Sequence, residues 1–140
     1  MIEGFWLLQE CTLAFSDGRP PKHPFQKGMI CYSPHGYMQA SLSVHPREDS
    51  SRTGLEIGHR LSSQEKEKAF DAYLSYGGRY TSDDREVTHF VDFSLNPSVI
   101  GTTLKRNYTL QENRLLLFYT HHVRSDLSIS YSLHWIRAHK

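Results

Sequence analysis

The sequence predicts an all-β fold, namely an eight-stranded antiparallel β-barrel with one helix between the third and fourth strands. Three observations predict it: segments of alternating apolar and polar residues recur, turn-forming stretches separate most of them, and one segment alone has helical periodicity. Eight antiparallel strands can close into a barrel just wide enough for one small ligand, and closure removes exposed sheet edges. A two-sheet sandwich is the alternative architecture, and residues 1–140 are interpreted as a single domain.

The N-terminal part of the chain supplies three predicted strands. The first spans residues 4–15, and a proline-rich turn at 16–24 follows it. The second and third, at 27–32 and 37–44, are joined by the turn-forming sequence SPHG, which favours a hairpin. Residues 46–60 are polar and rich in Ser, Arg and Gly, which is typical of a surface loop.

One helix is predicted over residues 62–76. It opens with Ser62 as the N-cap and Glu65 three positions later, a capping box in which each side chain satisfies a free backbone amide. Apolar residues at helical spacing give the helix one apolar face, formed by Ala69, Phe70, Tyr73 and Leu74. The glycine pair at 77–78 is expected to end the helix, because glycine tolerates left-handed backbone dihedrals. We expect the helix to pack against the side or mouth of the barrel.

Five more strands follow at short, even spacing with hairpin-length connections. They span residues 78–82, 86–95, 101–111, 114–122 and 127–138. Because side chains alternate between the two faces of a strand, the pattern within each segment predicts which residues point into the barrel.

Composition and charge exclude several functional classes. Sixteen Lys and Arg against fifteen Asp and Glu leave a net charge of +1, so nucleic acid is not expected as a partner. No apolar run approaches the ~20 residues of a membrane helix, and the first twenty residues lack a secretory signal pattern. We therefore expect a cytoplasmic protein without membrane contact. Cys11 and Cys31 are expected to be free thiols, with pairing across neighbouring strands as the alternative.

No motif predicts a metal, a haem or another cofactor. The adjacent histidines at 121 and 122 would face opposite ways on a strand and could not share an ion. No nucleotide-binding glycine motif occurs, and no serine or cysteine has an indicated activating base, so we expect no covalent catalysis.

Strand alternation predicts an apolar interior with one polar corner. On strand 86–95, His89 and Phe93 fall on the apolar face. On strand 101–111, Arg106 and Tyr108 share the inward face, and alternation from Trp6 also points Glu10 inward. The remaining candidates for ligand contact are Met38, Leu42, Tyr80, Tyr131 and Trp135.

Strand pairing predicts which polar side chains meet. If the strands that carry His89 and Arg106 form a hairpin around residues 96–100, His89 falls opposite residue 107, give or take one. A nearby guanidinium would keep His89 neutral near pH 7. Such a corner suits an anion, because Arg106 could hold a carboxylate or enolate while His89 moves a proton.

Structural alternatives stay open for each of these residues. His89 can be a satisfied core histidine. Arg106 can be neutralised by a structural pair with Glu10, since a buried guanidinium without a partner is costly. Tyr80, Tyr108 and Tyr131 can be core or rim residues whose hydroxyl groups only need partners.

The two ends of the chain carry motifs of a known group of barrels. Residues 4–6 read GFW, a G-x-W at the start of the first strand, and residues 135–137 read WIR. They resemble the lipocalins and other calycins, in which such a tryptophan closes one end of the barrel and a C-terminal arginine packs across its ring. Trp6 and Arg137 match these two roles. A guanidinium over an indole face contributes about 1 kcal/mol.

The order of four longer blocks gives a more specific resemblance, to a lipocalin-like domain family of about this length found in bacteria and fungi. The blocks are KGMICYSPHGYMQASL, LSSQEKEKAFDAYLSYGGRY, VTHFVDFSLNPSVIGTTLKRNYTLQENRLLL and the terminal LHWIR. The resemblance implies a calycin-type barrel. The helix in the middle of the chain and the lack of a disulfide framework depart from secreted lipocalins and count against an extracellular carrier.

The leading hypothesis is that the barrel binds a small, largely apolar molecule with a polar or anionic end. One version is a cofactor-independent isomerase or cyclase, similar to barrels of natural-product pathways, with Arg106 holding an oxyanion, His89 as acid or base, and Tyr80 positioning a carbonyl. The other is a non-catalytic intracellular carrier or sensor. A partner-binding module that uses the 46–60 loop is a third hypothesis, and a homodimer is kept as an option.

Overall fold

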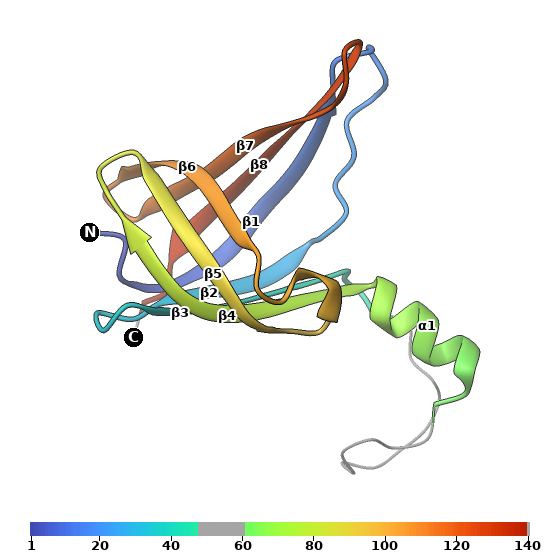
Figure 1. Cartoon of the computed structure of the whole chain (residues 1–140), viewed down its shortest axis with the longest axis horizontal. Helices are drawn as coiled ribbons and strands as arrows, with labels where there is room; N and C mark the ends of the chain where they lie inside the picture. Colours follow the sequence, from blue (N-terminus) through green and yellow to red (C-terminus); the bar gives the residue numbers. More distant parts are fainter. Residues whose placement is uncertain (48–60, 140) are drawn as a thin grey trace.

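The computed structural model describes residues 1–47 and 61–139, and its strands form a closed antiparallel barrel. The strands and helices are β1 (Gly4–Phe15), β2 (Lys27–Tyr32), β3 (Tyr37–Ser43), α1 (Ser63–Asp71), β4 (Tyr73–Ser82), β5 (Glu86–Ser94), η1 (Pro97–Val99), β6 (Thr103–Gln111), β7 (Arg114–Arg124) and β8 (Leu127–Arg137). Each strand pairs with the next, and β8 returns to pair with β1 (Figure 1). The predicted eight-stranded barrel is thus confirmed, in place of the sandwich. Most of the predicted 46–60 loop lies outside the described residues.

The two termini lie at the same end of the barrel, and α1 projects near the opposite end (Figure 1). At the end near the termini, the Trp6 indole is fully buried and the Arg137 guanidinium carbon lies 4.1 Å from its ring centroid. Gly4 makes this contact possible, because a Cβ there would lie 2.6 Å from Nη1 of Arg137. The roles predicted for Trp6 and Arg137 are confirmed.

Two β-bulges change which side chains point inward. In β1 the pairing with β8 shifts between Leu8 and Glu10, which turns Cys11 inward and Glu10 outward. In β5 a shift opposite Gly77 and Gly78 leaves Phe93 on the outer face, 54% exposed. The predicted inward placement of Glu10 and Phe93 is therefore wrong, because one extra residue moves every later side chain to the other face.

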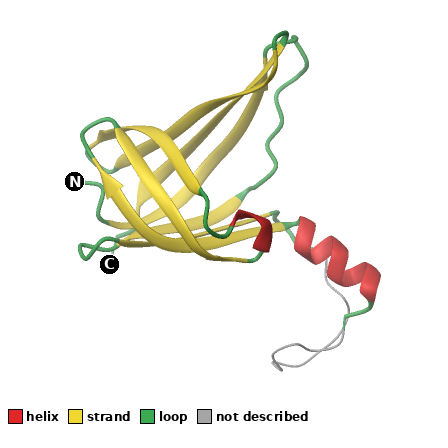
Figure 2. Cartoon of the chain, in the orientation of Figure 1, coloured by secondary structure: helices red, strands yellow, loops and turns green. Residues whose placement is uncertain are grey.

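Helix α1 begins as predicted and ends earlier than predicted. Ser62 accepts a hydrogen bond from the Glu65 amide, and the Glu65 carboxylate accepts one from the Ser62 amide. The predicted end at 77–78 is wrong, because β4 starts at Tyr73 and pairs with both β3 and β5. Pairing within the sheet overrides a local helical pattern. No residue of α1 is buried, and the helix extends away from the barrel (Figure 2), so the expected packing is also wrong.

Gly78 permits the close approach of β4 and β5 at the bulge. A Cβ there would collide with the carbonyl oxygen of Phe90 and lie 2.9 Å from the Asp92 amide nitrogen. We expect Gly78→Ala to lower the free energy of unfolding by about 2 kcal/mol or more, measured by urea denaturation. The control is Gly18→Ala, where φ is +85° and no atom lies within 4 Å, so only backbone strain of about 1 kcal/mol is expected. Equal losses would contradict the steric explanation.

Candidate ligand-binding site

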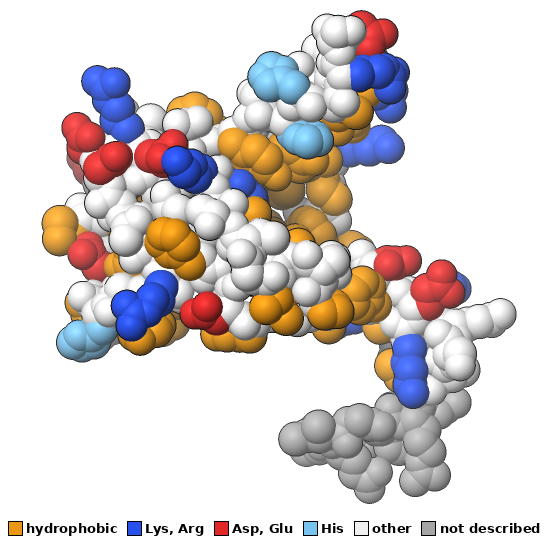
Figure 3. All heavy atoms as spheres, viewed as in Figure 1, with side chains coloured by type: hydrophobic (Ala, Val, Ile, Leu, Met, Phe, Trp, Pro, Cys, Tyr) orange, Lys and Arg blue, Asp and Glu red, His pale blue; other side chains and the backbone are white. Residues whose placement is uncertain are grey.

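The barrel contains a cavity of about 310 Å³, at the small end of the range for small-molecule sites. Most of its wall is apolar and includes Leu13, Phe25, Ile30, Leu42, Leu117 and Leu133. Figure 3 shows the hollow, with hydrophobic side chains gathered between the β7–β8 hairpin and the strands below it. Five polar or amphipathic side chains interrupt this wall: Tyr76, His89, Arg106, Tyr119 and Tyr131.

His89 lies on β5, is 1% exposed, and joins two tyrosines. Its Nε2 lies 2.7 Å from the hydroxyl of Tyr32 at the end of β2, and its Nδ1 lies 2.7 Å from the hydroxyl of Tyr76 on β4. Burial first, and the Arg106 guanidinium second, lower the pKa of His89 from 6.5 to about 3. His89 is thus neutral at pH 7, as predicted, although burial is a larger cause than the guanidinium on which the prediction rested.

Arg106 reaches the same cavity from a different register position than the one predicted. His89 pairs with Leu104, and Arg106 pairs with Val87, so the predicted partner of His89 at residue 107 is wrong. The connection between β5 and β6 contains η1 and is centred earlier in the chain than the predicted turn at residues 96–100, because Phe90 pairs with Thr103 and Val91 exchanges backbone hydrogen bonds with Gly101 and Thr102. Arg106 stands diagonally across from His89, and both side chains line the cavity.

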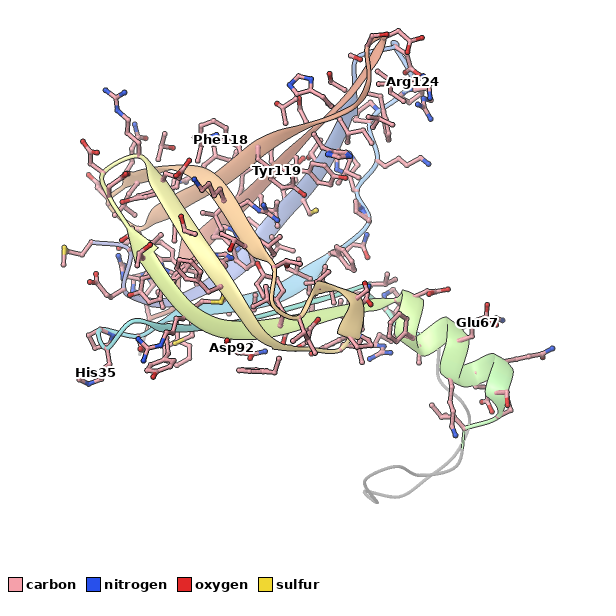
Figure 4. All side chains as sticks on the ribbon, in the orientation of Figure 1. His35, Glu67, Asp92, Phe118, Tyr119 and Arg124 are labelled. Atoms are coloured by element: carbon pink, nitrogen blue, oxygen red, sulfur yellow. The ribbon has the colours of Figure 1, made fainter. Side chains whose placement is uncertain are left out.

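The guanidinium of Arg106 stacks on an aromatic pair. Its Cζ lies 3.8 Å from the ring centroid of Tyr119, which is stacked on Tyr131 at 4.4 Å with an interplanar angle of 2°. In Figure 4, Tyr119 and its neighbour Phe118 lie on opposite sides of β7. Burial raises the pKa of Tyr119, and Arg106 opposes that shift. Tyr119 and Tyr131 therefore hold the guanidinium without neutralising it.

No carboxylate pairs with Arg106 within residues 1–47 and 61–139. Its one hydrogen bond there is donated by Nη1 to the Lys105 carbonyl oxygen at 3.0 Å. The alternative pair with Glu10 is wrong, because the bulge turns Glu10 outward, where its carboxylate lies 3.9 Å from His23 Nδ1. Arg106 is thus a half-buried cation on an apolar wall, with its charge open to the cavity.

Of the other predicted site residues, some line the cavity and the others lie elsewhere in the barrel. Leu42, Tyr131 and Trp135 line the cavity as predicted, although the Trp135 indole nitrogen is buried with no partner among the described residues. Met38 is buried in the core but does not line the cavity. Phe93 lies on the outer face of the barrel.

Tyr80 and Tyr108 use their hydroxyl groups elsewhere in the fold. The Tyr80 hydroxyl donates to the Ser33 carbonyl oxygen at 2.6 Å, and the Tyr108 hydroxyl donates to the Asp83 carbonyl oxygen. Neither side chain lines the cavity. Their placement matches the alternative in which they are core or rim residues whose hydroxyl groups need partners: Tyr80 is buried in the core, and Tyr108 is half-buried.

Two tyrosines that line the cavity, Tyr76 and Tyr119, were missing from the predicted site, and so was the buried Tyr32 that contacts His89. Simple alternation could have found Tyr32, which shares a face with Ile30, and Tyr119, which shares one with Leu117. Tyr76 was missed because its segment has a helical pattern, whereas the structure places it in β4, where its hydroxyl lies 2.7 Å from Nδ1 of His89.

The residues that the structure describes also bear on metal binding, membrane spanning and thiol chemistry. No group of three His, Cys, Asp or Glu side chains within residues 1–47 and 61–139 is placed to hold a metal ion. No helix in these ranges has the length and apolar character to cross a membrane. Cys11 and Cys31 are both free thiols, as predicted, and Cys11 lines the cavity.

A closed barrel around one small cavity defines a class of protein, the small-molecule-binding β-barrels. A family model described as a lipocalin-like domain matches residues 3–137, a range that contains every strand of the barrel. The chain therefore belongs to the lipocalin-like domain family, and this fold suggests small-molecule binding. No curated protein matches the chain significantly.

Proposed function

We propose that this protein binds one small, largely apolar molecule with a polar or anionic end inside the barrel. The observation that carries the proposal is Arg106, a cation without a carboxylate partner among the described residues, on the wall of an apolar cavity. An apolar tail would fill the cavity, and an anionic end would give the half-buried guanidinium a partner of opposite charge. The structural alternative for Arg106 lacks support because Glu10 faces outward.

Chemistry on the bound molecule is a second candidate, favoured by the presence of a cation and a hydroxyl network in one cavity. An isomerisation or cyclisation without a cofactor would draw on Arg106 to stabilise an oxyanion and on the wall to fold the reacting chain. Direct acid–base work by His89 receives no support, because both ring nitrogens are hydrogen-bonded and its pKa is about 3. A non-catalytic carrier or sensor is therefore better supported than an enzyme. A molecule that co-purifies with a carrier or sensor would be recovered chemically unchanged.

Replacing Arg106 tests the proposed function. We expect Arg106→Met to weaken binding of decanoate by about tenfold to a hundredfold, because a charge-assisted hydrogen bond is lost while side-chain volume is kept. Binding of decan-1-ol should change by less than about threefold, since a neutral head group gains little from the charge. Titration calorimetry would measure both affinities, and tryptophan fluorescence would report them independently because Trp135 lines the cavity.

The matched control is Arg79→Met, on the outer face of β4, where the guanidinium stacks on Tyr37. This variant should bind both probes as the natural protein does. Failure of the natural protein to bind either probe, or an equal loss of decanoate affinity in both variants, would overturn the proposed function.

A further inference from the structure

The hydrogen bonds of His89 have a direction that can be worked out by counting donors. A neutral imidazole has one N–H donor and one bare nitrogen acceptor. Each nitrogen of His89 faces one tyrosine hydroxyl, at 2.7 Å in both cases. One tyrosine must therefore donate to the ring and the other must accept from it, and the accepting tyrosine keeps its own hydroxyl hydrogen for a different partner.

The burial of the two tyrosines decides between the two directions. Tyr32 is fully buried, and His89 is the one hydrogen-bond partner of its hydroxyl among the described residues. If Tyr32 accepted from His89, its hydroxyl hydrogen would be buried without an acceptor, which is costly. Tyr32 therefore donates to Nε2, and the ring proton lies on Nδ1.

The same reasoning leaves Tyr76 with a hydrogen to donate. Tyr76 accepts from Nδ1–H of His89, and within residues 1–47 and 61–139 no second partner takes its hydroxyl hydrogen. Unlike Tyr32, Tyr76 lines the cavity, so a bound molecule can accept this hydrogen bond. Burial raises the pKa of Tyr76 to about 12, which keeps it a donor at neutral pH, and Arg106 is close enough to oppose that rise.

We infer that the Tyr76 hydroxyl donates into the cavity and, together with Arg106, selects a ligand whose head group is a hydrogen-bond acceptor, a carboxylate or carbonyl oxygen. The inference deepens the proposed function and rests on it. Arg106 has only donors and its positive charge repels an ammonium group, and the Tyr76 hydroxyl already accepts from His89, so these two groups favour a head group that accepts hydrogen bonds. Tyr32 and His89 act as positioning residues that orient the Tyr76 hydroxyl.

The direction of the hydrogen bonds can be measured without any ligand. Long-range ¹H–¹⁵N spectra of the histidine-labelled full chain at pH 7 should show His89 as the neutral tautomer protonated on Nδ1. The chain has nine histidines, and comparison with His89→Gln would assign the signal. A proton on Nε2 would overturn the inference and leave the proposed function standing.

Binding tests the selectivity with three probes of equal chain length: decanoate, decan-2-one and decylamine. We expect the natural protein to bind decylamine at least tenfold more weakly than decanoate. Tyr76→Phe should weaken both decanoate and decan-2-one, by about tenfold, because each loses one donated hydrogen bond. Arg106→Met should weaken decanoate much more than decan-2-one, which separates a carboxylate from a neutral carbonyl.

The matched control is Tyr37→Phe, which removes a hydroxyl from an exposed tyrosine outside the cavity and should change each affinity by less than about twofold. Circular dichroism of each variant would verify the fold. Unchanged affinities in Tyr76→Phe would overturn this inference alone. Absence of binding by the natural protein would overturn the proposed function and this inference together.

Discussion

Lowering the pH from 7 to 4.5 is expected to reduce the free energy of unfolding by about 3 kcal/mol through His89 alone. The folded pKa is about 3, against 6.5 for an unperturbed histidine. Between these values the unfolded chain binds a proton that the folded chain does not, so stability falls as the pH falls, by about 1.4 kcal/mol per pH unit. Above about pH 6.5 the contribution of His89 is constant. Urea denaturation at several pH values measures this slope.

The control for this prediction is His89→Gln, whose amide offers one donor and one acceptor to Tyr32 and Tyr76 but does not titrate. The difference in stability between the two proteins should narrow as the pH falls from 6.5 toward 4.5. The lowered pKa values of Asp17 and Asp83 also make stability fall in acid, but both groups are common to the two proteins and cancel in the difference. Parallel pH profiles would contradict the buried, neutral state of His89.

Removing the Trp6 indole is expected to cost about 4 kcal/mol of unfolding free energy. The side chain is fully buried, its Nε1 donates to the Ile2 carbonyl oxygen at 2.8 Å, and Arg137 covers its face. Arg137 in turn donates to the Glu3 carbonyl oxygen at 2.7 Å. Trp6→Ala therefore leaves a cavity, an unpaired carbonyl and an uncovered guanidinium, and urea denaturation would measure the loss.

A matched variant separates this packing effect from a general effect of strand β1. Phe5 is the preceding residue, is 55% exposed and faces outward, so Phe5→Ala should cost less than about 1 kcal/mol. Trp6→Phe keeps part of the apolar area and provides a milder test if Trp6→Ala does not fold. Similar losses for Phe5→Ala and Trp6→Ala would show that the barrel does not depend on its tryptophan plug.

The structure supports both descriptions of His89, as a core residue with satisfied hydrogen bonds and as a residue of the cavity wall. His89 is a satisfied core residue, since both its nitrogens have partners, and it also lines the cavity. Its contribution to binding would come through Tyr76, whose hydroxyl it orients. A substitution of His89 is thus expected to change head-group selectivity indirectly, by freeing Tyr76 to rotate.

The sequence by itself determined the strand count, the all-β class and the inner faces of the strands that run without interruption, while closure into a barrel in place of a sandwich was shown by the structure. Alternation placed Arg106 on the inner face of β6, and Tyr131 and Trp135 on that of β8, because a period of two is a local property of the extended chain. The capping box fixed the start of α1 for the same reason, since its two residues are three positions apart.

Only the tertiary structure decided which polar groups meet. The bulge in β1 turned Glu10 outward, and a β5–β6 connection centred earlier in the chain than predicted shifted the partner of His89 from residue 107 to Leu104. Tyr32 and His89 are 57 residues apart in the chain, so no local pattern indicates their hydrogen bond. Register and bulges depend on the energies of pairing between whole strands, and a single shifted residue reverses every later side chain.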